Sequence, residues 1–129
     1  MTEKEKRIEK ANKLLKKIAS CGRNFFYYGE DKTTAKFILK NNRIYFMDEY
    51  TKSEMLAYNY RQLGRKFNQG GTMKALVLDI SEWIRTGKYT NGKNGYGGLF
   101  CPHWGYPEKD MKDIQDYARE LGYLKEKSQ

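Results

Sequence analysis

The chain has 129 residues, with 25 lysines and arginines against 16 aspartates and glutamates, and a formal net charge of +9. It also carries 11 tyrosines, 6 phenylalanines and 2 tryptophans. Positive charge attracts polyanions at long range, and amphipathic aromatic rings stack on bases or fill a partner's pocket. This composition favours a binding protein over an enzyme, and it predicts no cofactor.

The length suits one hydrophobic core, so residues 1–129 are predicted to form a single domain with frayed ends at 1–4 and 125–129. No stretch approaches the roughly 18 to 20 consecutive apolar residues of a membrane helix. The N-terminal segment is charged where a signal peptide is apolar. Two cysteines and no glycosylation sequon give no sign of a secreted, disulfide-linked scaffold. We therefore expect a cytoplasmic protein without a membrane partner.

The N-terminal segment is predicted to form an amphipathic helix that ends near Cys21 and Gly22. Thr2 followed by Glu5 is typical of a capping box. The apolar face recurs at helical spacing and comprises Ile8, Ala11, Leu14, Leu15, Ile18 and Ala19. Lysines crowd the other face towards its C-terminal end. They complement the helix dipole there, so a solvated lysine face already explains the pattern and is favoured over a face that contacts nucleic acid.

After Gly22 the period of the apolar residues changes from about 3.6 to 2, which predicts strands. Strands are predicted at residues 25–28, 34–40, 43–49 and 54–60. Asn41 and Asn42 form a tight-turn signal between the second and the third. The 54–60 segment is also compatible with a helix by propensity. Short connections between these strands predict an antiparallel meander.

Two further helices follow in the sequence. Gly70 and Gly71 precede a helical pattern that stops at Gly87, with Thr72 as the predicted N-cap. A glycine pair before a helix N-terminus is also typical of an anion-binding site. The segment lacks the Gly-Lys-Ser/Thr sequence that ends a P-loop, so ordinary helix capping is the favoured explanation. Pro107 and Gly122 frame the last helix.

The sequence therefore predicts an α+β fold. Its elements are an N-terminal amphipathic helix, a three- to four-stranded antiparallel meander, a core helix, a long loop and a C-terminal helix. The predicted core residues are Leu14, Leu15, Ile18, Phe37, Leu39, Ile44, Phe46, Leu76, Val77, Ile80, Ile84, Met111, Ile114 and Leu121.

Residues 88–106 form a long segment rich in glycine, tyrosine and asparagine, without sustained periodicity. Loops of this length inside compact domains are usually functional or mobile. Two alternatives stay open: a partner-binding surface, or an ordered connector that covers one edge of the core. The aromatic residues that would anchor a protein partner are Tyr89, Tyr96, Phe100, Trp104 and Tyr106.

Patterns that indicate catalysis or metal binding are sparse. Cys21, Cys101 and His103 supply three candidate zinc ligands, fewer than the four of a structural site, so no metal site is predicted. The acidic pair Asp48-Glu49, with Lys52 and Glu54 nearby, resembles the carboxylate cluster of a metal-dependent nuclease. These residues fall at a predicted turn, where solvated charges are expected. No catalytic residue is assigned, and a small metal-dependent nuclease is the enzymatic alternative.

Charge is unevenly distributed along the chain. Residues 1–24 carry 8 basic and 3 acidic groups, whereas residues 107–129 carry 5 and 6. A polyanion is therefore expected to contact the first helix and the sheet loops, with the C-terminal helix turned away. The predicted residues for binding nucleic acid or another anion are Lys13, Lys16, Lys17, Arg23, Lys36, Lys40, Arg43, Arg61, Arg65 and Lys66.

The combination of the basic first helix, the aromatic strand at 25–28, the turn at 50–52 and the helix boundaries at 67–72 and 84–87 resembles small phage- and prophage-encoded proteins of unassigned function. The resemblance covers residues about 5–87. It implies a mobile genetic element and the host-cell cytoplasm, and it transfers no functional residues.

The resulting hypothesis is a small, basic, non-enzymatic accessory protein that contacts nucleic acid or a nucleoprotein complex. The alternative is a phage-encoded inhibitor that binds a host or defence protein through residues 88–106.

Overall fold

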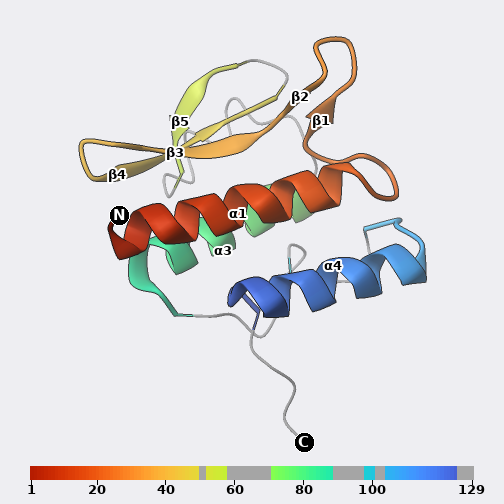
Figure 1. The fold of residues 1–129 in the computed structure, drawn as a ribbon. Coiled ribbons are helices and arrows are strands. Elements are labelled where there is room, and N and C mark those ends of the chain that lie inside the picture. The colour runs from red at the N-terminus through yellow and green to blue at the C-terminus, as the bar shows by residue number, and fades with distance from the viewer. Residues whose placement is uncertain (50–51, 58–70, 89–97, 101–103, 125–129) are drawn as a thin grey trace, which may run out of the picture.

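The computed structural model describes residues 1–49, 52–57, 71–88, 98–100 and 104–124 (Figure 1). The elements within these ranges are α1 (Glu3–Ala19), β1 (Tyr27–Tyr28), β2 (Thr33–Thr34), β3 (Lys36–Lys40), β4 (Arg43–Met47), β5 (Glu54–Leu56), α3 (Gly71–Thr86) and α4 (Glu108–Leu121). The predicted α+β class is confirmed. Of the helices that the structure describes, none combines the length and apolar content that crossing a bilayer requires.

Helix α1 begins with the predicted cap and buries the predicted face. The Thr2 hydroxyl accepts a hydrogen bond from the amide of Glu5 at 3.2 Å, which satisfies one of the free amides of the first turn. All six residues of the predicted apolar face are buried. The helix starts at Glu3, so residues 3 and 4, assigned to a frayed end, are helical.

The strands form two small antiparallel sheets where the sequence predicted a single meander. β1 pairs with β2, and a separate sheet has the order β3-β4-β5. The predicted strand over 34–40 is interrupted at Ala35, whose amide donates to the carbonyl of Phe26 at 2.9 Å. The chain therefore leaves the β1-β2 hairpin at this point and enters the larger sheet as β3.

The turn between β3 and β4 has the geometry that its sequence predicts. Asn41 and Asn42 have φ values of 51° and 62°, as the two central residues of a type I′ hairpin require. Of the predicted 54–60 strand, Glu54–Leu56 forms β5, and residues 58–60 lie outside the described residues.

Helix α1 is the central element of the fold. It contacts β3, α3 and α4, while α3 also contacts β4. In Figure 1 the sheet lies on one side of α1 and α4 on another, with α3 behind. Eleven of the fourteen predicted core residues are buried, and the other three, Leu39, Met111 and Leu121, are half-buried against the same cluster. The core also contains three large side chains that were not among the predicted core residues: Trp104, Tyr123 and Phe26.

The ends of the later helices agree with the sequence except at one residue. Gly87 follows α3 with φ of 79° and donates its amide to Trp83 O at 2.7 Å, and Gly122 ends α4 with φ of 88°. Helix α3 begins at Gly71, so Thr72 lies within the first turn and is not the N-cap.

Candidate nucleic-acid interface

One asparagine holds α1 along the edge strand of the larger sheet. Asn12 Oδ1 accepts from Phe37 N at 2.7 Å, and Asn12 Nδ2 donates to Phe37 O at 3.1 Å. The side-chain amide therefore takes the place of a neighbouring strand beside β3 and satisfies both backbone groups of Phe37. Nearer the start of the helix, Lys4 Nζ donates to Asn42 Oδ1 at 3.3 Å. These two attachments fix how α1 lies against the sheet.

Three predicted lysines form a row in the second half of α1. Lys13 and Lys16 are exposed and Lys17 is half-buried. We call this row the α1 lysine face. Among the residues that the structure describes, none of the three forms an ion pair, whereas Lys6 near the helix start pairs with Glu3 at 3.3 Å. The row is therefore a positive surface that neighbouring carboxylates do not neutralise.

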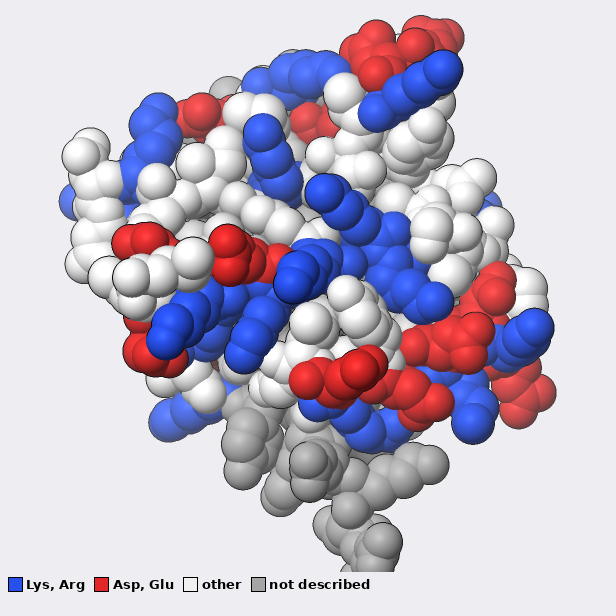
Figure 2. Space-filling model, in the orientation of Figure 1, with Lys and Arg blue, Asp and Glu red and all other residues white. Residues whose placement is uncertain are grey.

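Acidic residues border this positive surface on one side. Figure 2 shows lysine and arginine side chains across the middle of this view, over α1, and carboxylates gathered below them over α4. The carboxylates of α4 are Glu108, Asp110, Asp113, Asp116 and Glu120. A polyanion on the α1 lysine face would therefore be repelled from the α4 side and attracted towards the side of the sheet.

The other predicted basic residues do not all join this row. Lys36, at the start of β3, is exposed beside the Asn12 attachment. Lys40 and Arg43 lie at the far end of the β3-β4 hairpin, where Lys40 Nζ pairs with Glu54 Oε2 at 2.8 Å. The hydrogen bond and charge of Glu54 raise the pKa of Lys40.

Arg23 lies on another part of the surface. Its guanidinium is 5.6 Å from the centre of the Phe25 ring. The Arg23 side chain also packs close to Gly105, where an added Cβ would lie 3.0 Å from the guanidinium. The remaining predicted residues, Arg61, Arg65 and Lys66, lie outside the described residues. The predicted basic residues therefore do not form one surface. Three of them, Lys13, Lys16 and Lys17, lie together on α1, and the other described ones lie elsewhere.

A pocket that the sequence did not predict opens at the C-terminal end of the lysine face. Its volume is about 350 Å³, and its lining residues are Lys16, Ala19, Ser20, Asn24, Tyr27 and Thr34. We call it the hairpin pocket, because it lies between the end of α1 and the β1-β2 hairpin. One signal for it was present in the sequence: adjacent tyrosines in a strand point to opposite faces, so Tyr27 and Tyr28 could not both enter the core.

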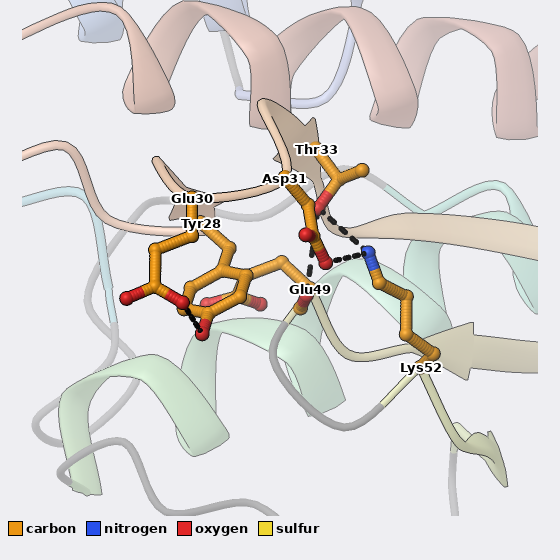
Figure 3. A network of polar contacts seen from close by, with 6 residues as sticks. All are labelled: Tyr28, Glu30, Asp31, Thr33, Glu49 and Lys52. Carbon is orange, nitrogen blue, oxygen red and sulfur yellow. Dashed lines mark hydrogen bonds and ion pairs between the residues drawn. The ribbon is translucent and has the colours of Figure 1, made fainter.

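A polar network fastens the β1-β2 hairpin to the segment between β4 and β5 (Figure 3). Lys52 Nζ pairs with Asp31 Oδ2 at 2.9 Å and donates to Thr33 Oγ1 at 3.1 Å. The Tyr28 hydroxyl donates to Glu30 Oε2 at 2.6 Å. Lys52 therefore holds the hairpin in place, a role that the nuclease-like interpretation of its neighbourhood did not anticipate.

The acidic pair beside this network is buried, and the prediction of solvated turn charges is wrong for it. Asp48 and Glu49 are 3% and 4% exposed. The hairpin lies against Glu49, since Thr33 Oγ1 donates to Glu49 O at 3.5 Å. Glu54 alone of the predicted acidic group is exposed, and it pairs with Lys40. Within the described ranges, no three His, Cys, Asp or Glu side chains converge as metal ligands would.

Two of the predicted partner anchors belong to the core. Trp104 and Tyr106 are 1% and 9% exposed, so the prediction that they contact a partner is wrong for this conformation. Phe100 is 40% exposed, and Tyr89 and Tyr96 lie outside the described residues. For residues 98–100 and 104–106 the structure supports the ordered-connector alternative.

Hydrogen bonds satisfy the polar groups of these two buried rings. Trp104 Nε1 donates to Gly98 O at 3.1 Å. The Tyr106 hydroxyl donates to Ile18 O at 2.9 Å and accepts from Phe25 N at 2.9 Å, so it joins the end of α1 to the chain that follows. Burial raises the pKa of Tyr106 from 10.0 to about 12.

The comparison with known proteins agrees with the mobile-element resemblance. The YoqU family matches residues 1–129. The chain belongs to this family. One relative, the SPbeta prophage-derived uncharacterized protein YoqU of Bacillus subtilis (strain 168), is 29% identical over 126 residues, which cover 95% of this chain and 85% of the relative. The predicted resemblance to prophage-encoded proteins is confirmed, and it extends over the whole chain, beyond the predicted 5–87. No solved structure matches the chain.

Proposed function

We propose that this protein is a small, non-enzymatic accessory factor of a phage or mobile element that binds nucleic acid in the host-cell cytoplasm. The observation that carries the proposal is the α1 lysine face. Lys13, Lys16 and Lys17 lie on one side of a helix that Asn12 fixes against the sheet. Among the described residues they form no ion pair, so their charge is available to phosphates.

The spacing of these lysines supports a contact with several phosphates. Residues three and four apart on a helix are surface neighbours, with Cβ atoms about 5–6 Å apart. Three such amines form a short positive track, and the acidic α4 beside it limits the directions from which a polyanion can approach. Nucleic acid is a suitable partner because each phosphate that a lysine neutralises releases condensed counterions.

The helix dipole explains Lys16 and Lys17, which lie in the last turn of α1, without any partner, and a mutational test separates the two explanations. Cations in the last turn of a helix stabilise it by about 0.3–1 kcal/mol each when exposed. If the dipole is their whole role, replacing them lowers stability and leaves the affinity for nucleic acid unchanged. If they contact phosphate, the affinity and its salt dependence both fall.

The experiment compares two double variants that remove the same charge. Lys13→Ala/Lys17→Ala alters the α1 lysine face, and Lys109→Ala/Lys112→Ala alters exposed lysines of the acidic α4. Fluorescence anisotropy with a labelled 20-base-pair DNA is measured over a series of salt concentrations. For duplex DNA, log K decreases as log salt increases. We expect this decrease to be shallower in the α1 variant, by about 1.8 in slope, since each lost phosphate contact contributes about 0.9.

The α4 variant is expected to keep the wild-type slope. Equal losses in both variants would show a general charge effect and contradict the assignment to α1. Absence of binding to both duplex and single-stranded DNA at low salt would remove the proposal altogether.

The inhibitor hypothesis remains the alternative proposal. Of its anchors within the described residues, Phe100 is the exposed one, and its ring centre lies 5.6 Å from the Arg119 guanidinium. Purification from host lysate with and without nuclease distinguishes the two proposals. Nucleic-acid binding predicts co-purifying material that nuclease removes, whereas a stoichiometric protein that persists after nuclease would favour the inhibitor.

A further inference from the structure

We infer that the hairpin pocket takes one unpaired nucleobase, so that the protein binds single-stranded nucleic acid in preference to duplex. The inference rests on the proposed function, because the α1 lysine face supplies the phosphate contacts next to that base. It goes beyond that function by naming the form of nucleic acid and the residues that distinguish it. The pocket and the face share Lys16, which lines the pocket and lies one helical turn from Lys13.

The size of the pocket suits a single nucleotide. Its volume of about 350 Å³ lies near the lower end of the roughly 300–1,000 Å³ typical of pockets for small ligands. A base inside a duplex is stacked and paired, so it reaches a pocket of this kind only after it is flipped out, at a cost in free energy. A single strand presents its bases without that cost, which makes it the favoured ligand.

Tyr27 supplies a partly exposed aromatic wall of the pocket. It is 39% exposed, and within the described ranges its ring makes no aromatic or cation contact. The next residue, Tyr28, points to the other face of the strand, where its hydroxyl donates to Glu30 (Figure 3). The Tyr27 ring is therefore available to stack on a base, which is how aromatic side chains bind single strands without strong sequence preference.

The rest of the lining combines an apolar surface with polar groups. Ala19 is 7% exposed and presents a methyl group between the ends of α1 and the hairpin. Asn24 and Thr34 carry amide and hydroxyl groups that can exchange hydrogen bonds with the edge of a base, and the Ser20 hydroxyl, which donates to Lys17 O at 2.8 Å, can still accept one. This mixture of one ring, one small apolar surface and a few polar groups is typical of a ligand pocket.

The walls of the pocket are held in place by backbone contacts in the turn between α1 and β1 and by an ion pair at the turn of the hairpin. Asn24, with φ of 58°, donates its amide to Cys21 O at 2.9 Å and accepts from Tyr27 N at 3.2 Å, which connects the end of α1 to β1. Lys52 fastens the other end of the hairpin through Asp31 at 2.9 Å. A site whose walls are already ordered loses less conformational entropy on binding.

The test uses three probes: a labelled 12-nucleotide single strand of DNA, the same strand in a duplex, and a free mononucleotide. It uses Tyr27→Ala, the conservative Tyr27→Phe, and Phe100→Ala as a control at another exposed aromatic residue. Because Tyr27 is exposed, circular dichroism should show the wild-type fold for its variants.

We expect the wild-type protein to bind the single strand more tightly than the duplex at equal salt. Tyr27→Ala should weaken single-strand binding about 5- to 150-fold, the range for losing one stacked base, without changing the salt slope. Tyr27→Phe and Phe100→Ala should stay close to the wild-type affinity, since the first keeps the stacking ring and the second lies elsewhere.

The outcomes that overturn the inference differ from those that overturn the proposed function. If Lys13→Ala/Lys17→Ala weakens binding while Tyr27→Ala does not, the lysine face stands and the pocket inference is wrong. If the duplex is the tighter ligand, the inference is also wrong. If only the free mononucleotide responds to Tyr27→Ala, the pocket binds nucleotides that are not part of a strand. If no probe binds at low salt, the proposed function is wrong as well.

Discussion

Replacing Asn12 with alanine tests how α1 is held against the sheet. The side chain makes two hydrogen bonds to Phe37, at 2.7 and 3.1 Å, in a partly buried position. Each is worth about 1 kcal/mol net, and their loss leaves both backbone groups of Phe37 without this partner. Alanine recovers about 0.5 kcal/mol because it is the better helix former. The expected loss of stability is therefore about 1.5 kcal/mol.

Urea denaturation followed by circular dichroism measures this loss. With an m-value of about 2 kcal/mol per molar, within the usual range for small proteins, the midpoint should fall by about 0.75 M. Lys10→Ala, on the exposed side of the same helix, is the control and should shift the midpoint by less than about 0.2 M. A shift as small as this in Asn12→Ala, or a rise in stability, would refute the argument that Asn12 attaches α1 to β3.

The remaining predictions concern the junction after α1. A Cβ at Gly22, where φ is +46°, would lie 2.4 Å from the Tyr106 ring, whereas a Cβ at Gly122, where φ is +88°, would meet nothing within 4 Å. Gly22→Ala should therefore destabilise the protein by about 1–3 kcal/mol more than Gly122→Ala in urea denaturation, and equal losses would contradict the crowding. Burial raises the pKa of Tyr106 from 10.0 to about 12, so the unfolded chain loses this proton first and stability should fall as pH rises from 10 towards 12. In Tyr106→Phe, the urea midpoint should decrease less between pH 10 and 12 than it does in the wild-type protein. The same pH dependence in both proteins would contradict the raised pKa of Tyr106.

Much of the fold could be predicted from short-range patterns. The Thr2 cap, the buried face of α1, the Asn41-Asn42 turn and the stop at Gly87 all agree with the structure. Each depends on residues within about one helical turn or one hairpin of each other, where propensity and hydrogen bonding act locally. The division of the strands into two sheets was not predictable in this way, because it depends on the contact between Ala35 and Phe26.

The candidate site was predicted only in part. Lys13, Lys16 and Lys17 were singled out from charge and helical spacing, and the structure places them in one row, with Lys13 and Lys16 exposed and Lys17 half-buried. The hairpin pocket was not predicted, because its lining residues come from the end of α1 and from the β1-β2 hairpin, and the sequence does not show that these segments meet. The predicted roles of Trp104 and Tyr106 failed because an aromatic residue in a glycine-rich segment is equally suited to a core and to a surface.

By itself, the sequence determined the helix and turn positions, the apolar face of α1 and the presence of an uncompensated positive charge. Tertiary structure decided which charges and rings stay exposed. It buried Asp48 and Glu49 beneath the β1-β2 hairpin, left Tyr27 facing the hairpin pocket, and set the acidic α4 beside the lysines of α1. The physical reason is that burial depends on contacts between segments distant in the sequence, and no local pattern specifies which segments will meet.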